Sequence, residues 1–152
     1  MIQQLIRTLS YIHKNGIVHR DIKSHNILVD SNFNIKLCDF GLARYKSELM
    51  FGTGAFSGTP AYMAPELYMK KAYDEKIDVF SFGTLMWEIL IRKIPYEGNE
   101  VLDIKNKVLN EENIYIPPKM VSETLSNIIH NCRSFDSEKR PTFSELGNIK
   151  YD

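Results

Sequence analysis

Apolar residues at the start of the chain recur at helical spacing. Within residues 2–14 they lie three or four positions apart and share one face of a helix: Ile2, Leu5, Ile6, Leu9 and Ile12. The pair Asn15-Gly16 follows, and both residue types tolerate the left-handed conformation that commonly ends a helix. We therefore predict an amphipathic helix over residues 2–14.

Three shorter apolar runs follow this helix and have the composition of β-strands. They are rich in β-branched residues: Ile17-Val18, Ile27-Leu28-Val29 and Ile35-Lys36-Leu37. Polar turn residues at 30–34 separate the last two runs and predict a hairpin. Between Gly41 and Gly58 the periodicity fades, which predicts a long loop, and long loops inside compact domains tend to be functional.

The second half of the chain has helical periodicity. Residues 79–91 are apolar nearly all the way round, a pattern typical of a buried central helix. Residues 101–109 and 122–132 predict amphipathic helices, and a capping-box pattern at Thr142-Phe143-Ser144-Glu145 begins a last one. The expected fold class is mostly α with a few short β-strands on the N-terminal side.

Composition narrows the class of protein. The 152 residues suit one domain, and 43% hydrophobic residues are too many for a disordered chain. The 19 basic and 19 acidic residues balance, which argues against binding to nucleic acid or an anionic membrane surface. No apolar run approaches the roughly 20 residues of a membrane span. Cys38 and Cys132 have no disulfide or metal-ligand spacing, so we expect a cytoplasmic, intracellular protein with reduced thiols.

Residues suited to chemistry gather in three motifs. The segment His19-Arg20-Asp21-Ile22-Lys23-Ser24-His25-Asn26 lies between strand-like runs, Asp39-Phe40-Gly41 follows the third run, and Ala64-Pro65-Glu66 closes the long loop. In this order and spacing the motifs resemble the C-terminal lobe of a eukaryotic-type protein kinase. Residues 58–63, residues 78–83 and Arg140-Pro141 extend the resemblance over essentially the whole chain. A single Asp or Asn of this kind is more often a turn residue, whereas three ordered motifs are specific.

The resemblance implies a phosphotransfer site that uses ATP and Mg²⁺ on protein substrates. Asp21 would accept the proton of the substrate hydroxyl or orient that hydroxyl, and Lys23 would contact the transferred phosphate. Arg20 would pair with a phosphate added to the long loop. Asn26 and Asp39 would bind Mg²⁺. The adenine would rest on an apolar floor at Leu28.

The resemblance also implies supporting contacts around this site. Asp78 would accept hydrogen bonds from the backbone amides of His19 and Arg20, since a buried carboxylate needs partners. Glu66 and Arg140 would form an internal ion pair. His19 and Phe40 would stack on each other, with Gly41 completing the motif. We expect His13 and His130 to face solvent or to cap their helices, and Trp87 to lie in the core.

The long loop would be the activation segment of such an enzyme. Its glycines at 52–58 resemble a phosphate-binding loop, but the third glycine falls one place late and no strand precedes them. Ser47, Thr53 and Ser57 are candidate phosphorylation sites, although the same residue types also simply favour a loop. The resemblance implies that Thr59 hydrogen-bonds both Asp21 and Lys23, and Lys23 and Thr59 favour serine/threonine specificity. Ser24 with residues 78–83 favours the tyrosine-kinase-like group.

In this family the glycine-rich loop, the phosphate-binding lysine and its glutamate partner lie upstream of these motifs. Met1 already belongs to the helix before the catalytic loop. We therefore expect residues 1–152 to be a C-lobe without its N-lobe, with weak ATP binding and slow transfer, and with an upstream N-lobe or regulatory domain as partner.

Three interpretations of this lobe stay open. The first is a truncated serine/threonine kinase, the second a non-catalytic binding or decoy module, and the third a tyrosine or dual-specificity kinase. Intact Asp21, Asn26 and Asp39 favour the first over the second, and Lys23 and Thr59 disfavour the third.

Overall fold

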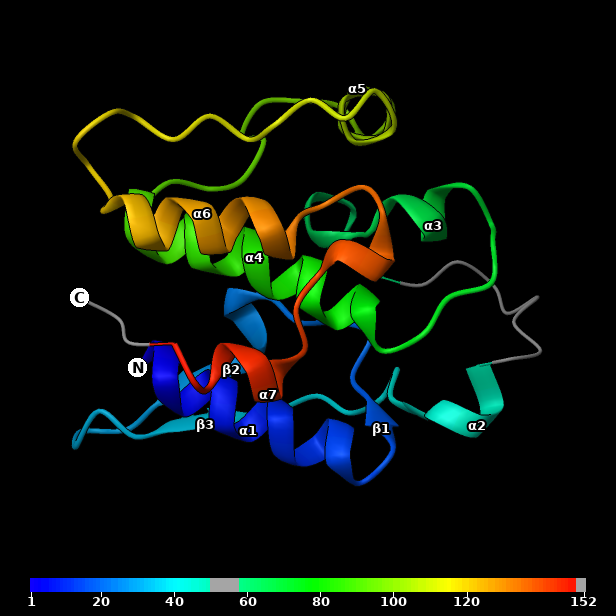
Figure 1. Ribbon diagram of the computed structural model, residues 1–152, viewed down its shortest axis with the longest axis vertical. Coiled ribbons are helices and arrows are strands. Elements are labelled where there is room, and N and C mark those ends of the chain that lie inside the picture. Colours follow the sequence, from blue (N-terminus) through cyan, green and yellow to red (C-terminus); the bar gives the residue numbers. More distant parts are fainter. Residues whose placement is uncertain (50–57, 150–152) are drawn as a thin grey trace.

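The long helix α4 (Lys76–Ile91) runs through the middle of the protein, as the computed structural model shows for the described residues 1–49 and 58–149 (Figure 1). The other helices are α1 (Ile2–Lys14), α2 (Lys46–Leu49), α3 (Pro65–Tyr68), α5 (Val101–Leu109), α6 (Glu123–Cys132) and α7 (Phe143–Leu146). The strands are β1 (Ile17–Val18), β2 (Ile27–Val29), β3 (Ile35–Leu37) and β4 (Arg44–Tyr45). The predicted fold class, mostly α with a few short strands, is confirmed.

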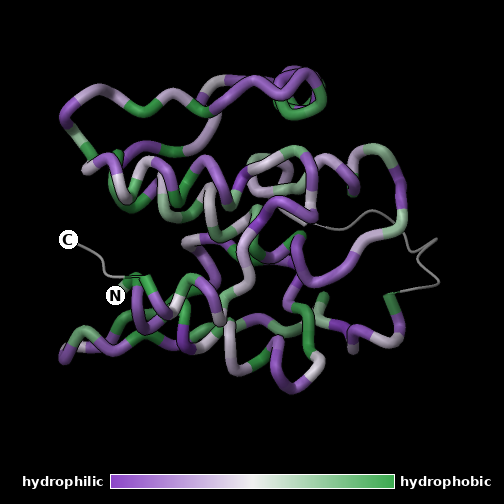
Figure 2. Tube along the Cα trace, in the orientation of Figure 1, coloured by the Kyte–Doolittle hydropathy of each residue, from purple (hydrophilic) through white to green (hydrophobic). Residues whose placement is uncertain are grey.

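The core forms where α4 meets α1, α6 and α7. Its fully buried side chains come from all four helices and include Leu9, Phe82, Ile129 and Leu146. In Figure 2 the tube alternates between hydrophobic and hydrophilic colours along α1, because only one face of that helix enters the core. By contrast, α4 is buried on nearly every side, as its uninterrupted apolar pattern predicts.

Helices α4 and α6 lie unusually close together at Gly83. A β-carbon at this position would lie 2.8 Å from Cβ of Cys132 and 2.9 Å from Cγ of Arg133. Only a residue without a side chain fits at such distances, so Gly83 sets the spacing of the two helices.

The strands form two small antiparallel sheets beside the helices. The predicted hairpin is confirmed, with Leu28 of β2 opposite Lys36 of β3. Asp30 shapes the turn by accepting hydrogen bonds from the backbone amides of Asn32 and Asn34 at 2.9 Å each. This hairpin presents β2 directly after the segment His19–Asn26.

The prediction of one long structureless loop after Gly41 is wrong in its described part. Strand β4 pairs with β1, placing Tyr45 opposite Ile17, and the backbone amide of Lys46 donates to Gly16 O at 2.7 Å. A turn of helix, α2, follows directly. The unpaired edge of β1, which is distant in sequence, supplies the backbone partners that make this strand form.

The predicted boundaries of the later helices agree with the structure. Helix α5 spans the expected residues, and α7 has both hydrogen bonds of the predicted capping box between Thr142 and Glu145. Within residues 1–49 and 58–149, no helix is both long and apolar enough to cross a membrane.

Ser122 caps the N-terminus of α6, where its Oγ accepts a hydrogen bond from Leu125 N at 3.3 Å. We expect Ser122→Ala to lower the free energy of unfolding by about 1 kcal/mol, because the amide loses its acceptor. Ser122→Asp is the matched control, since aspartate caps helices equally well. Urea unfolding of both variants checks this expectation, and equal losses in the two would contradict it.

Candidate active site

The segment His19–Asn26 is held in place by the carboxylate of Asp78, which lies in the first turn of α4. One carboxylate oxygen of Asp78 accepts from His19 N at 2.8 Å, and the other accepts from Arg20 N at 2.9 Å. Arg20 has a φ of 72°, a left-handed conformation that costs a non-glycine residue about 1–2 kcal/mol. The contact expected of Asp78 is present, and it holds a strained backbone at the start of the loop.

His13 does not face solvent as predicted. Its Nε2 lies 2.8 Å from Oδ2 of Asp78, and its ring packs edge-on against Phe143 with 4.9 Å between centroids. His13 follows Leu9 by four residues and Ile6 by seven, so it lies on the buried face of α1. The helical spacing therefore contained the signal that places His13 behind the loop.

A second carboxylate of α4 holds the middle of the same loop. Glu88 accepts a hydrogen bond from Ser24 Oγ at 2.9 Å and another from the Tyr62 hydroxyl at 2.6 Å. Burial and the neighbouring carboxylate raise the pKa of the Tyr62 phenol, so this hydroxyl stays a donor. Tyr62 lies in the motif of residues 58–63, but neither periodicity nor a motif indicates its contact with Glu88, because that contact joins distant segments.

His19 connects the loop to the Asp39-Phe40-Gly41 motif. Its Nδ1 accepts from Asp21 N at 3.3 Å, and its Nε2 donates to Cys38 O at 3.1 Å, which fixes one tautomer of the ring. Its ring also packs edge-on against Phe40, with centroids 4.8 Å apart, as expected. His19 therefore packs the loop and the motif together.

Asp21, Lys23 and Thr59 form a closed set of polar contacts. Lys23 Nζ lies 2.8 Å from Asp21 Oδ2 and donates to Thr59 Oγ1 at 2.8 Å. Thr59 in turn donates to Asp21 Oδ1 at 3.2 Å. Both hydrogen bonds expected of Thr59 are present, so the residue that closes the long loop is tied to the catalytic-loop segment.

Asn26 completes the surroundings of Asp21 and leaves an oxygen atom for a metal. Its Nδ2 donates to Asp21 O at 2.7 Å and to Asp21 Oδ2 at 3.1 Å. This orientation directs the amide nitrogen inward and leaves Oδ1 as an acceptor. Asp39, the first residue of the Asp39-Phe40-Gly41 motif, is exposed and has a φ of 60°. One of its carboxylate oxygens accepts a hydrogen bond from Gly41 N at 3.2 Å.

An amide oxygen and a carboxylate are ligands of the kind that Mg²⁺ prefers when phosphate oxygens complete its shell. No group of three His, Cys, Asp or Glu side chains in the described part of the chain is placed to hold a metal by itself. Asn26 and Asp39 therefore suit a metal that arrives with a nucleotide.

The other predicted site residues lie at the edges of this region. Leu28 of β2 is 57% exposed, and Ser47 is exposed on α2. The guanidinium of Arg20 lies over the ring of Tyr73, 5.8 Å from its centroid. Thr53 and Ser57 lie outside the described residues.

Glu66 and Arg140 form the expected internal ion pair. Nη1 and Nη2 of Arg140 donate to the two carboxylate oxygens of Glu66 at 2.6 and 2.8 Å. The pair is buried, and it ties α3 at the end of the long loop to the segment before α7. The predicted core position of Trp87 is also confirmed, and His130 is exposed as expected.

The charge of Lys23 should control the ionisation of Asp21. Burial raises the pKa of Asp21, but the hydrogen bond and charge of Lys23, with Asn26 and Thr59, outweigh it and bring the pKa below 3.8. The Asp21 carboxyl group therefore binds its proton more tightly in the unfolded chain than in the folded protein. The stabilisation that results is present above pH 3.8 and is lost as the pH falls through the lower folded-state value.

We expect Lys23→Met to raise the pKa of Asp21, because the opposing effect of burial remains after the cation is removed. A pH titration of the Asp21 carboxyl carbon by NMR measures this shift. Lys36→Met, on the exposed face of β3, is the control. An unchanged or lower midpoint in Lys23→Met would contradict the expectation.

Comparison with known proteins agrees with this geometry. A family model described as the protein kinase domain matches residues 1–151. A probable serine/threonine-protein kinase of Dictyostelium discoideum is 38% identical over 146 residues, which are 96% of this chain and 16% of that protein. A serine/threonine-protein kinase of Arabidopsis thaliana is 39% identical over 142 residues, 93% of this chain and 24% of that protein.

A dual specificity protein kinase of Dictyostelium discoideum is 40% identical over 131 residues, 86% of this chain and 18% of that protein. The chain thus spans a minor part of each of these relatives. With the motifs in order, the loop anchored on α4 and the family model covering nearly every residue, the chain belongs to the protein kinase family.

Proposed function

We propose that this chain supplies the catalytic loop and the metal-binding residues of a protein serine/threonine kinase. Such an enzyme transfers the γ-phosphate of ATP to a serine or threonine hydroxyl of a protein substrate. The observation that carries the proposal is the closed contact of Asp21, Lys23 and Thr59. A carboxylate, a cation and an activation-segment threonine meet there at the place where a substrate hydroxyl would enter.

The chemistry follows from what these side chains do with protons and charge. As the hydroxyl oxygen bonds to phosphorus, the bond to the ADP oxygen breaks and the hydroxyl proton passes to the Asp21 carboxylate. The low pKa of Asp21 keeps it ionised and ready to orient that hydroxyl. The ammonium group of Lys23 offsets negative charge on the phosphate, and Asn26 and Asp39 would hold Mg²⁺.

We further propose that residues 1–152 act as a C-lobe and that a second lobe, an N-lobe or regulatory domain, covers the nucleotide. Leu28 and Phe40 support this, because they are 57% and 44% exposed on the side where adenine and phosphates would rest. Large apolar side chains exposed together commonly mark a surface that another unit covers. ATP, Mg²⁺ and a cytoplasmic location belong to the same proposal.

Specificity for serine and threonine is supported by the Lys23–Thr59 hydrogen bond at 2.8 Å. The test mixes the chain with Mg²⁺, ATP radiolabelled in its γ-phosphate, and peptides that differ only in a Ser, Thr or Tyr acceptor. The reaction is repeated with a separately produced kinase N-lobe.

We expect label on the serine and threonine peptides, with the tyrosine peptide at least about tenfold lower. Label on the tyrosine peptide alone would contradict the proposed specificity. No label on any peptide, even with the N-lobe, would contradict the proposed activity and favour a non-catalytic binding module.

A further inference from the structure

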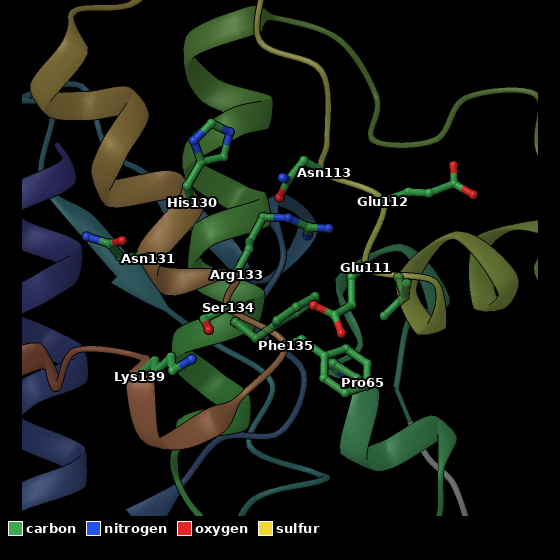
Figure 3. Close-up of a pocket in the computed structure, with 12 residues that line it drawn as sticks. Pro65, Glu111, Glu112, Asn113, His130, Asn131, Arg133, Ser134, Phe135 and Lys139 are labelled. Carbon is green, nitrogen blue, oxygen red and sulfur yellow. The ribbon is translucent and has the colours of Figure 1, made fainter.

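A cavity of about 280 Å³ lies between α4, the α5–α6 connection and the segment after α6 (Figure 3). None of the candidate active-site residues lines it. Its walls include Phe80 from α4, residues 111–113 from the connection, and Arg133, which ends α6. In Figure 3 the Arg133 side chain extends from the end of α6 toward the wall formed by residues 111–113.

The guanidinium of Arg133 is held firmly by neutral groups. It lies over the ring of Phe80, 4.5 Å from the centroid, and its Nη2 donates to the Tyr96 hydroxyl at 2.7 Å. Its Nη1 donates to Thr84 Oγ1. Gly83 leaves the space through which the stem of Arg133 crosses α4. The side chain is therefore half-buried, with its guanidinium held against Phe80, Thr84 and Tyr96.

Two guanidinium groups lie over the ring of Phe80, and only one of them pairs with a carboxylate of the described residues. Arg140 also lies over Phe80, 5.1 Å from the ring centroid, and it pairs with Glu66. Arg133 makes no ion pair with any Asp or Glu of residues 1–49 and 58–149. Burial lowers the pKa of Arg133, and the charge of Arg140 lowers it further. Arg133 is half-buried, and a partly desolvated cation without a counter-charge attracts an anion, so this site favours one.

We infer that the cavity binds a small oxyanion, either a carboxylate or a phosphate group, with Arg133 as its main charged contact. Only two of the five N–H donors of Arg133 have partners among the described residues, and the guanidinium fork matches two oxygens of an oxyanion. Lys139 and His130 line the same cavity and add cationic or donor groups. This site is independent of the proposed phosphotransfer.

Two acidic side chains also line the cavity and limit what it accepts. Glu111 and Glu112 are exposed, and Figure 3 shows Glu112 pointing away from Arg133. Neither one neutralises Arg133 in the structure, but both weaken the attraction of an anion to it. Removing one of these negative charges should therefore strengthen anion binding. Removing the positive charge of Arg133 should weaken it, so the two substitutions test the proposal in opposite directions.

The experiment titrates the whole chain separately with inorganic phosphate and with succinate. Proton–nitrogen NMR spectra follow the amides of residues 130–134, and thermal unfolding is measured in parallel. Arg133→Gln keeps a polar side chain but removes the charge, and Glu112→Gln removes an opposing charge. Lys23→Gln controls for anion binding at the candidate active site.

We expect saturable shifts in residues 130–134 and a raised melting temperature. Arg133→Gln should weaken binding about tenfold, Glu112→Gln should tighten it about twofold, and Lys23→Gln should leave it unchanged. Binding of only one probe would identify the ligand as phosphate or carboxylate. No saturable binding of either probe, or equal binding in Arg133→Gln, would overturn the inference.

If Arg133→Gln does not fold, Glu112→Gln decides the question. The exposed side chain of Glu112 makes no hydrogen bond or ion pair with the described residues, and its backbone amide, which donates to Lys107 O, is kept in the variant, so the substitution should leave the fold intact. Tighter binding would support the site at Arg133. Unchanged or weaker binding would overturn it.

Discussion

Asp21→Asn lowers the rate of phosphate transfer by about a thousandfold and leaves the fold intact. The amide cannot accept the proton of the substrate hydroxyl, and a positioned general base commonly contributes about 10²–10⁴ in rate. The amide still fits the space between Asn26 and Thr59, which contact Asp21 through hydrogen bonds at 3.1 and 3.2 Å. Initial rates of peptide phosphorylation, with a melting curve for each protein, measure both parts of this expectation.

Asp103→Asn is the matched control for this substitution. Asp103 is an exposed residue on α5 and lies outside the candidate site, so its variant should keep the rate of the unaltered protein. If Asp21→Asn retained more than about a tenth of the rate, Asp21 would not be the base.

Glu66→Ala destabilises the protein by about 3–5 kcal/mol, the usual cost of removing one partner from a buried ion pair. Arg140 is only 1% exposed, so its guanidinium would stay buried without a counter-charge. Its remaining acceptors are the backbone carbonyls of Ser134, Phe135 and Lys76. Carbonyl groups satisfy its hydrogen bonds but do not neutralise its charge.

Urea unfolding of Glu66→Ala gives this free energy directly. The control is Lys139→Ala, which removes an exposed ion pair with Asp136, 3.9 Å apart, on the same segment. Exposed pairs contribute about 0–1 kcal/mol, so this variant should unfold nearly as the parent protein does. A loss below about 1 kcal/mol in Glu66→Ala would show that Arg140 finds another counter-charge.

Local patterns predicted most of the helices and the hairpin. The boundaries of α1 and α5 agree with their apolar spacing, and the capping box at Thr142 begins α7. Each of these signals depends on residues within a few positions of one another. Strand β4 was missed because its partner, β1, lies more than twenty-five residues earlier, as the pairing of Val18 with Arg44 shows.

The motifs predicted the polar residues of the site better than they predicted the helix residues that hold the loop in place. Asp78, Thr59 and Arg140 make the contacts that the family resemblance implies. The role of Glu88 depends on how α4 packs against the loop, and sequence spacing does not encode that packing. His13 could have been assigned to the buried face of α1 from its distance to Leu9, whereas Glu88 had no such signal.

Net composition also hides a local imbalance of charge. The chain balances 19 basic against 19 acidic residues, yet of the two guanidinium groups over Phe80 only that of Arg140 pairs with a carboxylate of the described residues. A sum over the whole chain cannot reveal this, because it depends on which side chains the fold brings together.

The central claim is that the region around Asn26 and Asp39 holds a divalent metal together with ATP. Mn²⁺ can replace Mg²⁺ as a paramagnetic probe, and it broadens the NMR signals of nearby amides whether or not transfer occurs. With ATP present, we expect Mn²⁺ to broaden the amide signals of Asn26 and Asp39 in the parent protein. In the Asp39→Asn variant we expect this broadening to be absent. Broadening that is absent from both residues, or unchanged in Asp39→Asn, would contradict the claim.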